Sequence, residues 1–188
     1  AGSRYDLIVP LRKLGLMVRR VPAGLFSSAM SPFMGRVDNP FEQSFYYPPN
    51  LSPDAARAIF REAHYDVSGE VLNQLASLFE PGGLRSRDRG TLYGDRASEI
   101  NSPIQFIAGE RDQQCSPGVV AHNLALLDGE QHEIQYFGRS HGHTDHYGHF
   151  DLFAGLRAEQ EVFPHILRWI EAHAVTPVHA NRPAEAPA

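Results

Sequence analysis

The ten residues from Pro103 to Asp112 read PIQFIAGERD, a short apolar run that leads directly into a charged turn. An apolar run of this length, rich in β-branched and aromatic side chains, is typical of a buried parallel strand, so we expect a strand over 103–108. Parallel sheets carry active-site groups just beyond the carboxyl ends of their strands. Glu110 and Asp112 are therefore the first candidates for a functional site.

The residues that follow predict a strand–helix–strand unit. A helix should begin after Ser116 and Pro117 and stop at Asp128-Gly129, and a second short strand should span 133–137. A closing helix should then present one apolar face, made of Val162, Phe163, Ile166, Leu167 and Ile170. The pattern predicts the α/β class, with parallel strands, flanking helices and a right-handed crossover. Two strands are few for such a sheet, so we expect the chain to be the C-terminal part of a larger α/β domain.

The first half of the chain has a different pattern, which we interpret as a helical cap. One helix should start at Ser52-Pro53, and another should follow Ser68 with an apolar face of Val71, Leu72, Leu75, Leu78 and Phe79. We therefore expect an N-terminal segment and helical cap or lid over 1–101 and a core over 102–174. A disordered, proline-rich tail should occupy 175–188.

Composition excludes several classes of function. The formal net charge is −5, from 17 Lys and Arg against 22 Asp and Glu, and no run of like charge predicts a nucleic-acid or membrane surface. No apolar run is long enough to span a membrane. The single cysteine, Cys115, requires no oxidising compartment, which favours the cytoplasm.

The loop GRSHGHTDHYGH, residues 138–149, matches three catalytic patterns. The first is the G-x-S-x-G nucleophile elbow, centred on Ser140. That elbow needs a helix directly after the serine, and its chain order is serine, then acid, then histidine. Here the following residues are poor helix formers and the acidic turn comes before Ser140. We therefore expect this match to be accidental.

The second pattern is the H-x-H-x-D-H metal cluster of the metallo-β-lactamase fold. His141, His143, Asp145 and His146 offer three imidazoles and a carboxylate, a ligand set suited to zinc. That fold completes its site with further ligands much later in the chain, and only about forty residues remain here. A zinc-dependent hydrolase stays open as an alternative, although we expect no dedicated metal or cofactor.

The third pattern combines an acid after one strand with a histidine after the next. Asp112 follows the first strand and His149 the second, so a parallel sheet would bring the two side chains together. The acid would then orient the imidazole for proton transfer. Glu110 is the second choice for the acid. Asp151 is too close in sequence to His149 for that role and is expected to cap a helix or brace the loop.

Residues 102–172 resemble the C-terminal strands of the α/β-hydrolase superfamily, in its acid-lipase-like branch. Gly109-Glu110-Arg111-Asp112 is similar to the G-x-x-D turn that carries the triad acid in that branch. His149-Phe150-Asp151, followed by Gly155, Ala158 and an apolar helix, is similar to its histidine motif. The resemblance implies a serine carboxylic-ester hydrolase without cofactor, in which Asp112 and His149 belong to the triad.

The resemblance also implies a serine that the chain does not offer. No elbow precedes Asp112, and Ser27 and Ser28 lack flanking glycines. We therefore expect the chain to need an N-terminal hydrolase part or a second polypeptide, and to have little activity alone. A non-catalytic interaction module is the remaining alternative. An apolar ester is the expected substrate, because the cap region is rich in aromatic residues that could line a pocket or form ordinary core: Phe41, Phe45, Tyr46, Tyr47, Phe60 and Phe79.

Overall fold

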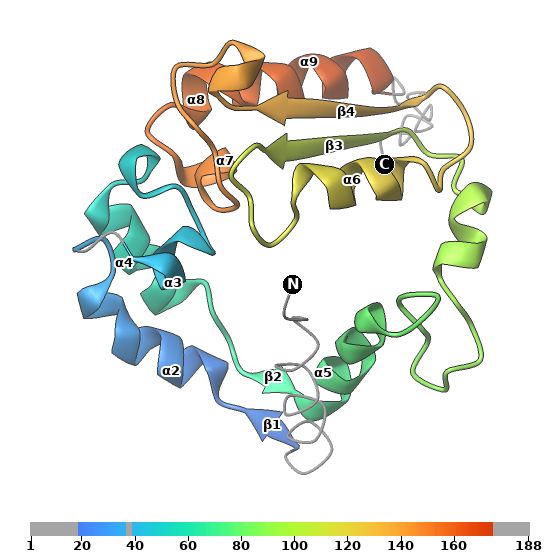
Figure 1. Cartoon of the computed structure of the whole chain (residues 1–188), viewed down its shortest axis with the longest axis horizontal. Coiled ribbons are helices and arrows are strands. Elements are labelled where there is room, and N and C mark those ends of the chain that lie inside the picture. The colour runs from blue at the N-terminus through green and yellow to red at the C-terminus, as the bar shows by residue number, and fades with distance from the viewer. Residues whose placement is uncertain (1–18, 37–38, 175–188) are drawn as a thin grey trace, which may run out of the picture.

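The computed structural model describes residues 19–36 and 39–174 of the chain. Its ribbon follows a ring in which helices α2 to α4 form one side, a pair of very short strands lies at the bottom, and two parallel strands close the ring at the top (Figure 1). The predicted tail over 175–188 lies outside the described residues.

Two parallel strands, β3 (Ile104–Gly109) and β4 (His132–Phe137), form the sheet that the apolar runs predict. Helix α6 (Pro117–Leu124) connects them along the chain. Helices α6 and α9 (Phe163–His173) lie on opposite sides of the two strands (Figure 1). The α/β class is confirmed at this level, and within the described ranges the parallel sheet has two strands.

The other elements are short. The very short antiparallel strands are β1 (Arg20–Val21) and β2 (Val67–Ser68). The remaining α-helices are α2 (Ala23–Met30), α3 (Pro40–Gln43), α4 (Pro53–Glu62), α5 (Gly69–Leu75), α7 (Asp151–Ala154) and α8 (Ala158–Glu161). The 3-10 segments are η1 (Ser31–Phe33), η2 (Pro48–Asn50), η3 (Ala76–Phe79), η4 (Gly94–Glu99) and η5 (Arg139–His141).

Helix α4 begins where the sequence predicts, because Ser52 caps it. The Ser52 side chain accepts a hydrogen bond from the N–H of Ala55 at 3.1 Å, and Pro53 occupies the first helical position. We expect Ser52→Ala to lower the free energy of unfolding by about 1 kcal/mol, measured by urea denaturation. Ser102→Ala is the matched control, since Ser102 is exposed and makes no side-chain hydrogen bond to any described residue. Equal losses in the two variants would contradict the prediction.

Helix α5 begins after Ser68 as predicted, but it ends sooner. The chain tightens into the 3-10 turn η3 after Leu75, where the sequence predicts a helix that continues to Phe79. The apolar face of this segment is not covered by the described residues. Its exposed side chains are Val71 (46%), Leu75 (44%), Leu78 (50%) and Phe79 (48%).

Two further expectations about helices need correction. Helix α6 ends at Leu124, short of Asp128, and the Ser116 side chain makes no capping hydrogen bond. In α9, Phe163 and Ile166 pack against the core, whereas Leu167 and Ile170 are 57% and 49% exposed. The predicted apolar face of α9 is therefore only half buried by the residues that the structure describes, because the two-stranded sheet offers too little surface to cover it.

Several aromatic residues of the first half belong to a hydrophobic core. Tyr46 and Phe60 are buried together with Met34, Leu51 and Ala56. The Phe45 ring packs against Phe60 and Phe150, with ring centroids 5.1 and 5.6 Å apart. Phe41 and Phe79 remain exposed. Of the two readings that the sequence left open for these aromatic side chains, ordinary core applies to Tyr46 and Phe60.

A second core lies next to the sheet and is joined to the first by the loop after β4. This core consists of Phe137, Tyr147, Leu152, Ala158 and Val162. The N–H of Phe150 donates to the Phe45 carbonyl at 2.9 Å, and the N–H of Leu156 donates to the Asn50 carbonyl at 2.8 Å. Segment 45–51, which belongs to the predicted cap, is thus bound directly to the loop that carries the candidate histidine.

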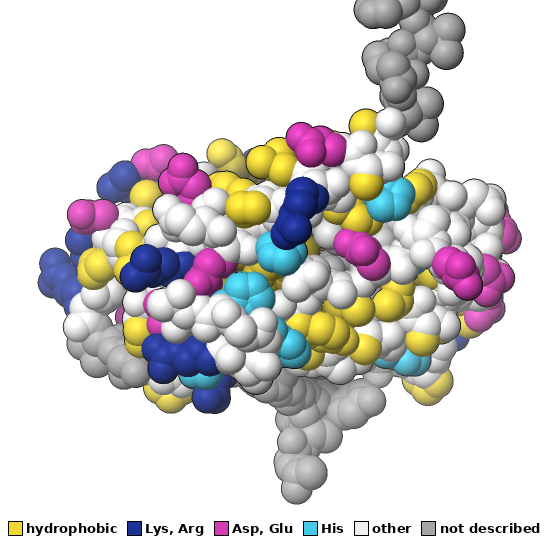
Figure 2. Space-filling model, turned by 90° about the horizontal axis from the view of Figure 1, so that it is seen from above, with side chains coloured by type: hydrophobic (Ala, Val, Ile, Leu, Met, Phe, Trp, Pro, Cys, Tyr) yellow, Lys and Arg dark blue, Asp and Glu magenta, His cyan; other side chains and the backbone are white. Residues whose placement is uncertain are grey.

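The surface shows no extended patch of one charge on the side that carries α8 and α9. Figure 2 shows acidic, basic and histidine side chains scattered among apolar ones there. No helix within the described residues combines the length and apolar character needed to cross a membrane.

Candidate active site

The turn after β3 and the loop after β4 meet at the carboxyl end of the sheet. Gly109 and Phe137 lie opposite each other, and the N–H of Glu110 donates to the Phe137 carbonyl at 2.9 Å. Beyond the strands, the N–H of Arg111 donates to the Tyr147 carbonyl at 2.8 Å. A Cβ on Gly109 would lie 2.4 Å from that carbonyl oxygen, so glycine permits this close approach of the two backbones.

Asp112 and His149, which the sequence singled out, are hydrogen-bonded at this edge. His149 Nδ1 donates to Asp112 Oδ2 at 2.8 Å. The other oxygen, Oδ1, accepts the N–H groups of Gln114 and Cys115, each at 2.8 Å. The Asp112 side chain is 2% exposed and the His149 side chain 36%. The carboxylate is therefore fixed inside its turn, while the imidazole reaches the surface.

The pKa of His149 is raised above its ordinary value of 6.5. The largest cause is the hydrogen bond to Asp112, and the negative charges of Asp112 and Asp151 act in the same direction. Partial burial of the ring opposes them. Because the carboxylate favours the charged imidazole, the pair is suited to accept a proton at Nε2 and hold it during a reaction.

This shift makes the folding stability depend on pH. The folded chain binds the His149 proton more tightly than the unfolded chain does, so the contribution is fully present below about pH 6.5 and is lost as the pH rises through the folded-state pKa. We expect the urea midpoint to fall between about pH 6 and about pH 8.5 more steeply in the wild type than in His149→Gln. Nuclear magnetic resonance titration of the ring protons measures the pKa directly. A value at or below 6.5 would contradict the prediction.

An apolar cavity of about 260 Å³ lies beside the imidazole. Besides the polar residues Asp112, Cys115, Asn123 and His149, its walls come from β3, α6 and α7: Phe106, Ile107, Val119, Val120, Leu152 and Phe153. Val119 and Phe153 are 50% and 61% exposed, so the cavity has an open side. An apolar group bound there would lie next to a proton acceptor, which is the usual composition of a small-molecule site.

Asp151 braces the loop from inside the protein. The residue is fully buried, and its carboxylate accepts the N–H groups of Gly148 at 2.9 Å and Tyr47 at 3.1 Å. The side-chain amide of Asn50 donates to the second oxygen at 3.3 Å. Burial is the main reason that the pKa of Asp151 is raised. Of the two roles that the sequence offered for Asp151, the structure shows the brace, since Phe150 occupies the N-cap position of α7.

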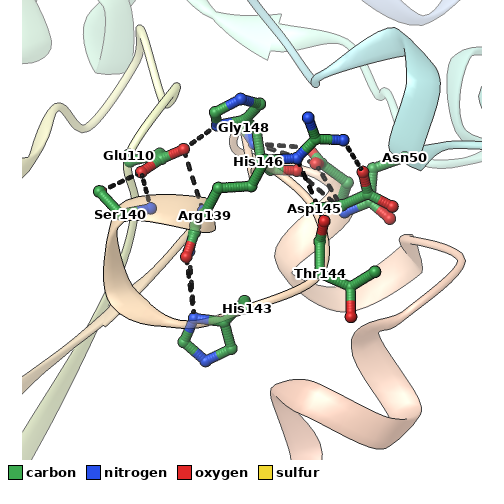
Figure 3. A network of polar contacts seen from close by, with 11 residues as sticks. Asn50, Glu110, Arg139, Ser140, His143, Thr144, Asp145, His146 and Gly148 are labelled. Atoms are coloured by element: carbon green, nitrogen blue, oxygen red, sulfur yellow. Dashed lines mark hydrogen bonds and ion pairs between the residues drawn. The ribbon is translucent and has the colours of Figure 1, made fainter.

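Glu110, the second-choice acid, binds a different set of partners. Its carboxylate accepts hydrogen bonds from His146 Nδ1 and from the Ser140 hydroxyl, and from the N–H groups of Arg139 and Ser140 at 3.2 Å each (Figure 3). The Ser140 hydroxyl is therefore bound to a carboxylate and has no imidazole to remove its proton. A single 3-10 turn follows Gly138 where an elbow would need a helix, which agrees with the expectation that the G-x-S-x-G match is accidental.

The histidines of the H-x-H-x-D-H pattern, which the sequence offered as an alternative metal site, contact separate partners. The ring of His141 stacks on Tyr136 with centroids 5.1 Å apart. His143 packs against Phe137 at 4.9 Å, and its Nδ1 lies 3.2 Å from the Gly138 carbonyl. Figure 3 shows His143 on the opposite side of the loop from Glu110.

The remaining members of that cluster are bound to other side chains. Asp145 accepts a hydrogen bond from the Arg139 guanidinium at 2.9 Å, and His146 is bound to Glu110. Within the described residues, no group of three His, Cys, Asp or Glu side chains is placed to hold a metal ion. The loop sequence supplies ligand types at suitable spacing, but its fold turns them away from one another.

No hydroxyl or thiol in the described part of the chain is hydrogen-bonded to His149 Nε2. The Ser27 and Ser28 hydroxyls donate to the carbonyls of Phe60 and Arg61, at 2.7 and 3.0 Å, and so tie α2 to the end of α4.

Cys115 lines the apolar cavity, but burial and the Asp112 charge raise the pKa of its thiol. The thiol therefore stays protonated at neutral pH, which makes it a poor nucleophile.

Two parts of this site were not predicted from the sequence. The sequence contained a signal for the pairing of Glu110 with His146. Two acids two residues apart follow one strand, and two histidines three residues apart follow the next strand. The contacts of Tyr47 and Asn50 with the histidine loop had no such signal, since about one hundred residues separate the partners.

Comparison of the chain with protein-family models, with curated proteins and with solved structures found no match.

Proposed function

We propose that this chain contributes the acid and the histidine of a serine carboxylic-ester hydrolase. The observation that carries the proposal is the 2.8 Å hydrogen bond from the half-exposed imidazole of His149 to the buried carboxylate of Asp112. This bond occupies Nδ1 and leaves Nε2 open for a proton. The nucleophilic serine is supplied from outside the described residues, by another part of the polypeptide or by a second one.

In this reaction His149 transfers the proton and Asp112 orients and stabilises the imidazole. As the serine Oγ attacks the ester carbonyl carbon, its proton moves to His149 Nε2, and Asp112 stabilises the imidazolium. The proton then passes from Nε2 to the leaving alcohol as the carbon–oxygen bond breaks. A water molecule repeats both steps on the acyl-enzyme, which releases the acid and restores the serine. His149 returns to its neutral form after each half-reaction.

The substrate class follows from the cavity beside His149. Its apolar walls and volume of about 260 Å³ suit a short apolar acyl or alkyl group, and Asp112 and His149 are among the residues that line it. The buried aromatic residues Tyr46 and Phe60 are not available to line it, because they belong to the first core.

A fluorophosphonate probe, which labels activated serines, tests the proposal. The chain alone is expected to take up no label, whereas a partner that co-purifies with it should be labelled on a serine. His149→Ala should abolish this labelling, and His122→Ala, a change of an exposed histidine on α6, should leave it intact.

Full labelling with His149→Ala would contradict the proposed roles of Asp112 and His149. A stable complex without any labelling would favour a non-catalytic interaction module. Stoichiometric zinc in the purified protein, together with chelator-sensitive hydrolysis, would favour the metal-dependent alternative.

A further inference from the structure

The turn after β3 carries a second carboxylate that no step of the proposed reaction uses. Glu110 and Asp112 lie two residues apart, and each is bound to a histidine of the same loop, His146 and His149 respectively. The two pairs differ in their surroundings. The His149 side chain is 36% exposed and lines the apolar cavity, whereas that of His146 is 19% exposed and packs edge-on against Tyr47 with ring centroids 5.1 Å apart.

The carboxylate of Glu110 holds the loop at both ends. It binds the N–H groups of Arg139 and Ser140 at the start of the loop and His146 near its end, as Figure 3 shows. The Glu110 side chain is only 14% exposed. Its hydrogen-bond partners among the described residues are donors of the loop itself.

Gly138 provides the space for this contact. A Cβ at Gly138 would lie 2.2 Å from the carboxyl carbon of Glu110, and the residue has a φ of +154°. Both features favour glycine at this position, because the carboxylate passes directly over the backbone. The absence of a side chain at Gly138 therefore leaves room for the Glu110 carboxylate at the start of the loop.

Only Tyr147 and Gly148 separate His146 from His149, and both are held in place. The Tyr147 carbonyl accepts the N–H of Arg111, and the Gly148 N–H donates to Asp151. His146 and His149 therefore lie at the two ends of one short segment that is hydrogen-bonded to the turn after β3.

We propose that Glu110 is a positioning residue for His149. It clamps the histidine loop onto the turn that carries Asp112, and so sets the distance between the imidazole and its carboxylate. The consequence for catalysis rests on the proposed function, whereas the clamp itself is a property of the folded chain and is measurable without any substrate.

The test is the pKa of His149, measured by nuclear magnetic resonance in the full chain. Asp112 and Asp151 are the carboxylates that raise this pKa most. In Glu110→Ala we expect the pKa to fall by about 0.5–1 unit, because a displaced imidazole loses part of its hydrogen bond to Asp112. Glu133→Ala, which removes a carboxylate that accepts a hydrogen bond from Gln105 across the sheet, should leave it unchanged.

His146→Gln separates geometry from charge. Loss of the Glu110 charge would lower the His149 pKa, whereas loss of any positive charge at His146 would raise it. A clamp predicts a fall in both variants. Ser140→Ala removes one of the four donors and should give a smaller fall in the same direction.

An unchanged His149 pKa, within about 0.2 unit, in folded Glu110→Ala or His146→Gln would overturn the proposal, as would shifts of opposite sign. Circular dichroism establishes that each variant is folded. If Glu110→Ala and His146→Gln do not fold, the His149 pKa of Ser140→Ala is the test, and an unchanged value there overturns the proposal. A fall in the pKa combined with full serine labelling in His149→Ala would leave the clamp standing and refute the proposed function.

Discussion

Replacement of Asp112 by asparagine is expected to lower the turnover of the proposed hydrolase, assembled with its serine-bearing part, by about 10⁴-fold. The Oδ1 position accepts the N–H groups of Gln114 and Cys115, so the amide oxygen of the new side chain must take that place. The amide nitrogen then faces His149 Nδ1 as a donor. This arrangement forces the ring proton onto Nε2, where it blocks transfer of a proton from the serine.

The change of tautomer is measurable in this chain without a partner. Nitrogen chemical shifts of His149 should show the proton on Nδ1 in the wild type and on Nε2 in Asp112→Asn, with a lower His149 pKa in the variant. Asp145→Asn is the matched control, since Asp145 lies in the same loop and binds Arg139. Turnover within about tenfold of the wild type in Asp112→Asn would remove Asp112 from the proposed triad.

Replacement of Asp151 by alanine is expected to lower the free energy of unfolding by about 3–5 kcal/mol. Three donors would lose their acceptor at a fully buried position, namely the N–H groups of Gly148 and Tyr47 and the side-chain amide of Asn50. These donors come from both sides of the contact between the two cores. The loss should therefore loosen segment 45–51 from the histidine loop as well as destabilise the fold.

Urea denaturation measures this loss, with Asp95→Ala as the control for removing an exposed carboxylate. Asp151→Asn should lose less than Asp151→Ala, because it keeps an acceptor oxygen and removes the cost of burying a charge, which is the cause of the raised Asp151 pKa. A loss below about 1 kcal/mol in Asp151→Ala would contradict the role of this residue as a brace.

The strands and the capped helices could be predicted from the sequence, because their signals are local. An apolar run between turn residues predicts β3 and β4, and Ser52-Pro53 predicts the start of α4. The early end of α5 and the exposed half of α9 could not be predicted in this way. Apolar periodicity indicates which side chains share a face, but it does not indicate whether another element covers that face.

The same distinction applies within the loop GRSHGHTDHYGH. The sequence alone determined that Asp112 and His149 follow consecutive parallel strands, and this topology brings their backbones to one edge of the sheet. Only the tertiary structure decided which side chains pair there. Ser140 and His146 are both hydrogen-bonded to Glu110, so neither has the geometry that the nucleophile and metal patterns require. The backbone path of the loop determines which donors lie close to this partly buried carboxylate. A sequence motif gives the residue types and their spacing along the chain. The direction of each side chain depends also on contacts with residues distant in the sequence.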